Sequence, residues 1–176
     1  NERGEDHHFP NKKRERGIYP VIPSEQIEWL RGELSSDKKT VIFSHMSLVN
    51  EFENRGICNK QEMLDLFEGK NVILCMNGHN HGDDLKIIEN IPFYTLNSSS
   101  FFCWWGGNPP GSEVREFPYK DALHVVVELE EKEIRINGME SEYLADTPDV
   151  VGLYDYRWKG VSIEPRTSSY VLRMSK

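Results

Sequence analysis

The sequence predicts an α/β fold with a mixed sheet, followed by antiparallel hairpins. Two short apolar runs, at residues 41–44 and 71–76, are separated by a segment with helical periodicity. Strands with this spacing pair in parallel through a right-handed crossover. Beyond residue 84, apolar residues alternate with polar ones, which is typical of hairpins. The 176 residues are enough for one domain with its own core.

An amphipathic helix is expected before each of the two strands. In residues 25–35, apolar residues recur at helical spacing, and Ser24 is the expected N-cap. In residues 60–68, Asn59 is the expected N-cap and Gly69 marks the end. The side chains expected to face the core are Ile27, Leu30, Leu34, Met63, Leu64 and Phe67.

The rest of the chain is expected to form hairpins and loops. Residues 84–96 and 123–136 have hairpin patterns, the first turning near Glu89 and Asn90. Residues 101–121, rich in Gly, Pro and aromatic residues, are expected to be irregular. Two units follow: residues 1–138, with a loop-like start over 1–19, and a C-terminal extension over 139–176 with short strands.

Composition and charge argue against several classes of protein. A net charge of −8 and a pI of about 5.3 disfavour non-specific nucleic-acid binding and docking on anionic membranes. Cys58, Cys75 and Cys103 have neither a disulfide framework nor zinc-ribbon spacing. The chain shows no signal peptide and no apolar run approaching the roughly 18 residues of a membrane span. We therefore expect a soluble chain whose compartment the sequence leaves unknown.

Three histidines are expected to gather at one edge of the sheet. His45 follows the first strand, and His79 and His81 follow the second. Ligand sites in open α/β sheets form outside the carboxyl ends of the strands, and imidazole suits transition metals. Two histidines separated by one residue usually point apart, so His79 and His81 are expected to serve two metals. The alternative for each is a polar side chain that hydrogen-bonds to backbone.

Four further residues are candidates for contacts with the ligands or with a substrate. Asp83 could orient an imidazole, or could lie in a solvated turn. Trp104 and Trp105 could form the wall of a pocket, or could close the end of the core. Asn80 lies between the two histidines of the second pair. His124, and the Asp-x-His spacing at residues 6–8, are weaker metal candidates because His124 falls mid-strand and no strand precedes residue 6.

Two of these segments resemble motifs of the calcineurin-like metallophosphoesterases. FSHMSL, at residues 43–48, resembles the family's strand that ends in Ser-His, and NGHNH, at 77–81, its later Gly-His-x-His motif. The match extends over residues 20–138. The resemblance implies a four-layer α/β/β/α sandwich and two divalent metals (Mn, Fe or Zn) bridged by an Asp and a hydroxide. It implies that His45 and His79 bind one metal, that His81 binds the other, and that the substrate is a phosphate mono- or diester.

The family's three earlier motifs, Asp-x-His, Gly-Asp-x-x-Asp and Gly-Asn-His, do not occur in this sequence. At Gly82-Asp83-Asp84, for example, Lys86 stands where the second Asp should be. The chain is therefore expected to be the C-terminal half of such a domain, inactive alone, with no catalytic side chain assigned. The alternative is a non-catalytic metal-binding or structural module that dimerises through an exposed sheet face. An unrelated structural zinc site lacks the closed four-ligand spacing.

Overall fold

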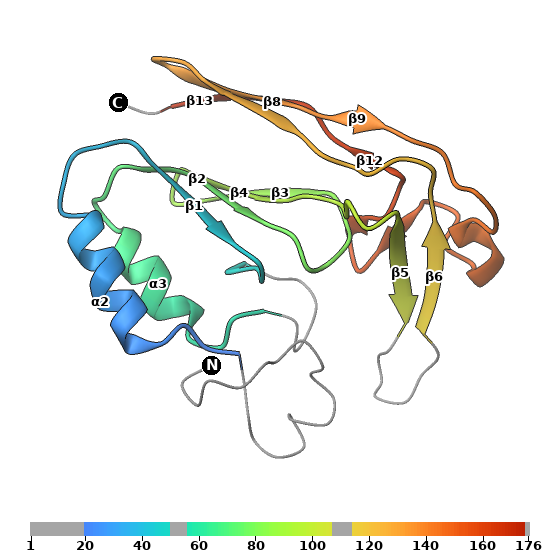
Figure 1. The fold of residues 1–176 in the computed structure, drawn as a ribbon, viewed down its shortest axis with the longest axis horizontal. Helices are drawn as coiled ribbons and strands as arrows, with labels where there is room; N and C mark the ends of the chain where they lie inside the picture. The colour runs from blue at the N-terminus through green and yellow to red at the C-terminus, as the bar shows by residue number, and fades with distance from the viewer. Residues whose placement is uncertain (1–19, 50–55, 107–113, 175–176) are drawn as a thin grey trace.

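The computed structural model describes residues 20–49, 56–106 and 114–174, which form one helical layer and two β-layers (Figure 1). The central layer is a mixed sheet with the order β1-β2-β4-β3. Its strands are β1 (Thr40–Ser44), β2 (Val72–Asn77), β3 (Asp84–Ile88) and β4 (Ile91–Thr95). Helices α2 (Ser24–Glu33) and α3 (Lys60–Phe67) cover one face. The fold class predicted from the sequence is confirmed.

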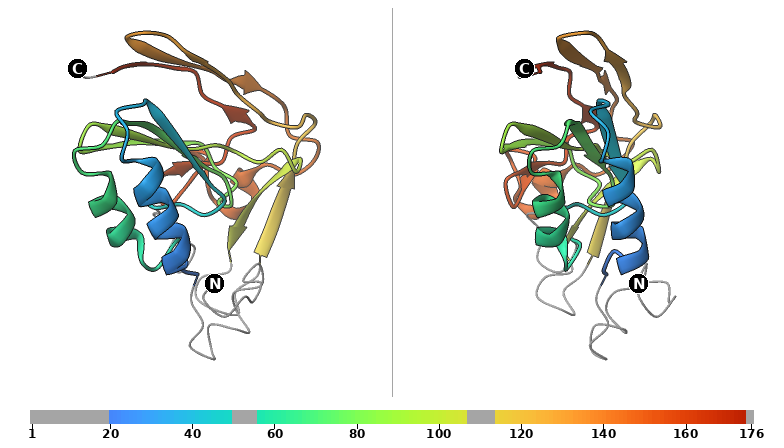
Figure 2. Two further views of the ribbon diagram at one scale, coloured as in Figure 1. Left: turned by 60° about the vertical axis from the view of Figure 1, so that its left-hand side comes forward. Right: turned by 90° about the vertical axis from the view of Figure 1, so that its left-hand side faces the viewer.

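The other face of the mixed sheet is covered by a second, antiparallel sheet with the order β13-β8-β7 (Figure 2). Its strands are β7 (Val126–Leu129), β8 (Glu133–Asn137) and β13 (Tyr170–Arg173). The apolar residues between the sheets include Leu74, Tyr94, Ile134 and Ile136, all at most 1% exposed. Strand β2 is therefore covered on both faces of the central sheet, which explains why each of its residues is buried.

The mixed character of the central sheet comes from one parallel crossover and one hairpin. β1 pairs in parallel with β2, across α3, as predicted. The hairpin of β3 and β4 turns at Glu89 and Asn90, whose φ angles of 49° and 66° suit a two-residue turn. β4 then pairs in parallel with β2, so the hairpin joins the sheet through its second strand.

The two helices form where expected, but their first turns differ from the prediction. The N-cap of α2 is Pro23, because its carbonyl accepts from the N–H groups of Gln26 and Ile27 at 3.0 and 3.1 Å. Ser24 is therefore the first helical residue, and its prediction as the cap was wrong. Asn59 is the N-cap of α3, yet its side chain does not bond to the helix backbone. Its Oδ1 accepts from the N–H of Ile22 at 2.9 Å, and its Nδ2 donates to the Ile22 carbonyl at 3.0 Å.

Residues 102–118 contain a hairpin where an irregular segment was predicted. β5 (Phe102–Gly106) pairs with β6 (Val114–Pro118) in antiparallel register. The Gly and Pro residues that suggested a loop lie mostly between the two strands. Cys103 and Phe117 face each other in this register, and both are fully buried. The prediction was wrong because aromatic and β-branched residues favour strands on both sides of the Gly/Pro cluster.

The C-terminal residues contain short strands, as predicted, and they pair with earlier parts of the chain. β9 (Met139–Glu140) pairs with β12 (Arg166–Thr167), and β13 pairs with β8. In the sequence between β9 and β12 lie the 3-10 helix η1 (Pro148–Val151) and two paired strands, β10 (Arg157–Trp158) and β11 (Val161–Ser162). Within the described ranges, every helix is too short or too polar to cross a membrane.

Candidate functional site

The candidate site begins where β1 and β2 end at the same level. Ser44 and Asn77, the last residues of the two strands, are register partners. Beyond them, the N–H of Gly78 donates to the carbonyl of His45 at 3.2 Å. The Ser44 hydroxyl donates to the Met46 carbonyl at 2.8 Å and holds the turn after β1. This register brings the residues that follow the two strands side by side.

His45 and His79 lie in direct contact at this edge. Nδ1 of His79 is 3.1 Å from Nε2 of His45, and the ring planes are inclined at 74°. Two nitrogens that share one zinc ion are about 3.3 Å apart at the tetrahedral angle and about 2.9 Å apart at a right angle, given Zn–N distances of about 2.0–2.1 Å. The observed separation falls between these values. The same distance is also that of a hydrogen bond between the two rings, in which one nitrogen donates and the other accepts according to the tautomer.

The backbone of the β2–β3 loop adopts the left-handed conformation at both histidines. The φ angles are 63° at His79 and 50° at His81, although neither residue is glycine. Such a conformation costs on the order of 1–2 kcal/mol for each residue and persists only where surrounding contacts enforce it. Between them, the N–H of buried Asn80 donates to the Gly78 carbonyl at 2.7 Å. In this loop conformation, the His79 ring contacts His45 and the His81 ring contacts Phe102.

His81 contacts a different element from His79. Its Nδ1 lies 3.0 Å from the carbonyl oxygen of Phe102, and its ring lies 4.8 Å from the Phe102 ring. Since a carbonyl oxygen only accepts, Nδ1 must carry the hydrogen, which leaves Nε2 with a lone pair in the neutral ring. Histidine ligands of metals commonly make this second hydrogen bond to a carbonyl. In this tautomer, Nε2 is the acceptor atom of the His81 ring.

The structure brings His45 and His79 together, but it does not add His81 to the same group. Among the residues that it describes, no three His, Cys, Asp or Glu side chains are close enough to hold one metal ion. The assignment of His81 to a second metal stays a prediction. Three neutral imidazoles cannot bridge two cations, so a dinuclear centre needs carboxylates in addition to these rings.

Asp83 is buried, at 5% exposure, and does not lie in a solvated turn. Its carboxylate accepts from the Tyr94 hydroxyl at 2.7 Å and from the N–H of Ser168 at 3.1 Å. The neighbouring carboxyl of Asp84 has its pKa raised, mainly by burial, while the Arg157 charge lowers it and the Asp83 charge raises it further. Sequence reasoning missed Tyr94 and Ser168, and no local pattern marks either residue.

The structure says less about the remaining candidate residues. Trp104 and Trp105 belong to β5, and their side chains lie outside the described residues, so their predicted roles remain predictions. The Asp-x-His spacing at residues 6–8 also lies outside them. His124 is exposed, as expected, and its Nδ1 lies 3.1 Å from the Ala122 carbonyl.

A cavity of about 720 Å³ opens beside the His45–His79 pair, between α2 and β1. Its lining is mainly apolar, and the two histidines stand in the same wall. Phe43 and Trp29 also line it, and they are 74% and 64% exposed. An apolar surface of this size next to imidazoles can bind a ligand that joins a polar group to an apolar one.

A scan against protein-family models and a search of curated proteins both found no match. Among solved structures, the chain is similar to a dimetal phosphatase from Danio rerio, with 18% identity, a TM-score of 0.49 and coverage of 72% of this chain. It spans 39% of that chain's length. It is also similar to a single mutant of Vps29 from Entamoeba histolytica, with 11% identity, a TM-score of 0.32 and coverage of 97% and 96% of the two chains.

Proposed function

We propose that this chain supplies the histidine side of a metal-dependent phosphoesterase centre. The observation that carries the proposal is the 3.1 Å distance between Nδ1 of His79 and Nε2 of His45. The two histidines follow adjacent parallel strands that end in register with each other. The resemblance of residues 43–48 and 77–81 to metallophosphoesterase motifs supports it. Residues 1–138 would then be the C-terminal part of the phosphoesterase domain, and residues 139–176 an extension of it.

In this proposal, the three histidines divide between two divalent ions, drawn from Mn, Fe and Zn. His45 and His79 hold one ion, and Nε2 of His81 binds the other while its Nδ1 stays bonded to the Phe102 carbonyl. The metals, when bound, lower the pKa of a water molecule and stabilise charge on the attacking and leaving oxygens of a phosphate ester. The protein's part is to fix the rings before the ions arrive. Among the described residues, no carboxylate joins these histidines in a group that could hold a metal ion, so a complete centre would need further carboxylates and the isolated chain is expected to be inactive.

The cavity beside the histidine pair favours phosphate mono- or diesters with an apolar alcohol group. Trp29, Ile42, Phe43 and Met46 line it and would contact that group, while the phosphate would lie towards His45 and His79. Aryl phosphates are therefore the first substrates to test. Metal-dependent turnover of p-nitrophenyl phosphate by this chain alone would contradict the expectation that it lacks half of the centre.

Zinc titration of three variants tests the metal site. His45→Ala and His79→Ala should each weaken Zn²⁺ binding by more than about 100-fold, above the 10- to 100-fold that loss of a supporting contact costs. His124→Ala is the matched control, because it removes an exposed histidine that is not a proposed ligand. Isothermal titration calorimetry measures all three. Equal affinities for the three variants would contradict the proposal.

A second candidate function is a non-catalytic module that binds metal and associates with itself. The predicted exposed sheet face is covered in the described part of the chain, on one side by the helices and on the other by the second sheet. Self-association is supported by β1, which is an edge strand of the described sheet and can pair with a strand of another chain. Its Phe43 side chain is 74% exposed. Sedimentation velocity should then show a homodimer that Phe43→Ser dissociates. A monomer at all concentrations would exclude this candidate.

A further inference from the structure

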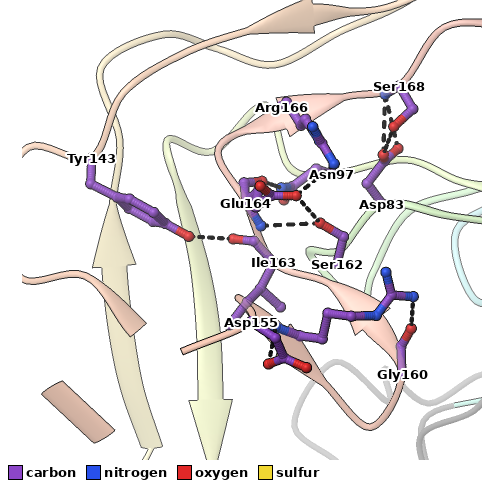
Figure 3. A network of polar contacts seen from close by, with 11 residues as sticks. Asp83, Asn97, Tyr143, Asp155, Gly160, Ser162, Ile163, Glu164, Arg166 and Ser168 are labelled. Carbon is purple, nitrogen blue, oxygen red and sulfur yellow. Dashed lines mark hydrogen bonds and ion pairs between the residues drawn. The ribbon is translucent and has the colours of Figure 1, made fainter. Parts of the chain in front are cut away.

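The β2–β3 loop contacts the C-terminal segment, residues 160–168, through Asp83, whose carboxylate bonds to Ser168 (Figure 3). The N–H of Asp83 donates to the Ser162 carbonyl at 2.8 Å, and the two residues form an antiparallel bridge. At Gly82, an added Cβ would lie 2.6 Å from Cγ1 of Val161 and 3.0 Å from the Ser162 oxygen. The two segments are therefore as close as a glycine allows.

The Asp83 carboxylate ties this loop to a second point in the same C-terminal segment. It accepts from the backbone N–H of Ser168, from the Ser168 hydroxyl and from the Tyr94 hydroxyl of β4. Burial raises the pKa of the Tyr94 phenol, and the Asp83 charge raises it further, so the phenol remains a donor. A buried carboxylate needs several such donors. The backbone that follows His81 is thereby fixed to residues 162 and 168.

The ring of His81 is connected to the same segment by a separate route. The Phe102 carbonyl that accepts from its Nδ1 lies 3.1 Å from the Tyr119 hydroxyl, which donates to the Ser98 carbonyl at 2.6 Å. That hydroxyl lies 3.3 Å from Oδ1 of Asn97, whose Nδ2 donates to the Glu164 carbonyl at 2.7 Å. The backbone that follows His81 is therefore hydrogen-bonded directly to residues 162 and 168, and its ring reaches residue 164 through the neighbouring contacts of Tyr119 and Asn97.

We propose that Asp83 is a positioning residue and that residues 160–168 set the ring orientation and tautomer of His81. The inference rests on the proposed function, in which His81 binds a metal through Nε2. A metal ligand must be held within about 0.5 Å of its working position, which requires contacts that fix both backbone and ring. The left-handed backbone at His81, with φ of 50°, depends on the same contacts. The C-terminal extension thus acts on the site without touching a metal.

The test compares the metal-free and zinc-loaded chain in four forms. The variants Asp83→Asn and Ser168→Ala weaken the contacts from the loop to the segment, and Asp84→Asn is the control on the adjacent carboxylate. Long-range ¹H–¹⁵N NMR of the metal-free imidazoles reports the His81 tautomer. We expect a single Nδ1–H form in the wild type and in Asp84→Asn, and a mixture of tautomers in the first two variants. Urea unfolding verifies that each variant is folded. If Asp83→Asn does not fold, Ser168→Ala alone tests the proposal.

Zinc affinity gives the second readout, and we expect a 10- to 100-fold loss for Asp83→Asn and for Ser168→Ala. An unchanged His81 tautomer in folded Asp83→Asn or Ser168→Ala would overturn the positioning role, as would an equal change in Asp84→Asn. If the tautomer changes while zinc affinity stays at the wild-type value in every variant, the positioning role holds and the proposed metal function of His81 fails. The two inferences are therefore separable by one set of samples.

Discussion

Replacing Gly138 with alanine should strongly destabilise the protein. Gly138 connects β8 to β9, opposite the backbone of residues 167 and 168. An added Cβ would lie 1.9 Å from the carbonyl oxygen of Thr167 and 2.6 Å from its carbonyl carbon. Both atoms belong to the backbone, so no rotamer change can relieve the contact. The C-terminal segment would have to move away from β9.

The size of the effect follows from what that movement disrupts. The N–H of Gly138 donates to Oγ of Ser169 at 2.9 Å, and the N–H of Met139 donates to Oγ1 of Thr167 at 3.0 Å. Losing both hydrogen bonds costs about 1–3 kcal/mol, at about 0.5–1.5 kcal/mol each. Overpacking adds about 1–3 kcal/mol. We therefore expect Gly138→Ala to lower the free energy of unfolding by about 4 kcal/mol.

Urea unfolding followed by circular dichroism measures this loss, and Gly32→Ala is the matched control. Gly32 is an exposed residue of α2, and nothing stands within 4 Å of its added Cβ. The same substitution there should stabilise the protein by up to about 1 kcal/mol, because alanine favours the helix. The two alanine variants thus shift in opposite directions. A Gly138→Ala midpoint equal to that of Gly32→Ala would refute the packing described here.

Two further predictions concern thiol reactivity and the core between the sheets. A thiol reagent should label exposed Cys58 in the native protein well before Cys75 and Cys103. Burial raises the pKa of the Cys75 and Cys103 thiols to about 12, which keeps them protonated near neutral pH. Peptide mass spectrometry measures the labelling rate of each cysteine, and equally fast labelling of all three would contradict the prediction. Leu74→Ala should lower the free energy of unfolding by about 3–4 kcal/mol, since Leu74 is 0% exposed, whereas Leu129→Ala, at 55% exposed, should change it by less than about 0.5 kcal/mol. Equal urea midpoints for these two leucine variants would show that the space between the sheets is not a packed core.

The parts of the fold that the sequence predicts are those set by neighbouring residues. The parallel pair of β1 and β2, the turn at Glu89 and Asn90, and the meeting of His45 with His79 all follow from apolar runs, turn residues and the ends of strands. The position of β4 between β2 and β3 does not, because periodicity records burial and not the identity of the neighbouring strand. The hairpin of residues 102–118 was hidden by the Gly and Pro residues between its strands.

The contacts around His81 show a different limit of sequence reasoning. Ser168 lies 85 residues beyond Asp83, and a single serine in a polar tail carries no mark of a buried partner. Likewise, Phe102 takes part through its carbonyl, which every residue possesses. Imidazoles can be found from their place at the ends of strands, whereas the groups that hold them are found only from coordinates.

The long separation between Asp83 and Ser168 bears on the order in which the molecule forms during synthesis. The residues that bring His45 and His79 together all lie within β1, α3 and β2, so this pair can form while the later part of the chain is still being made. The bonds to Asp83 require residue 168 to have left the ribosome. Contacts that close long loops also form late in folding. We therefore expect His45 and His79 to reach their final positions before His81. In a chain released before residue 168, only His45 and His79 should lie in their final positions.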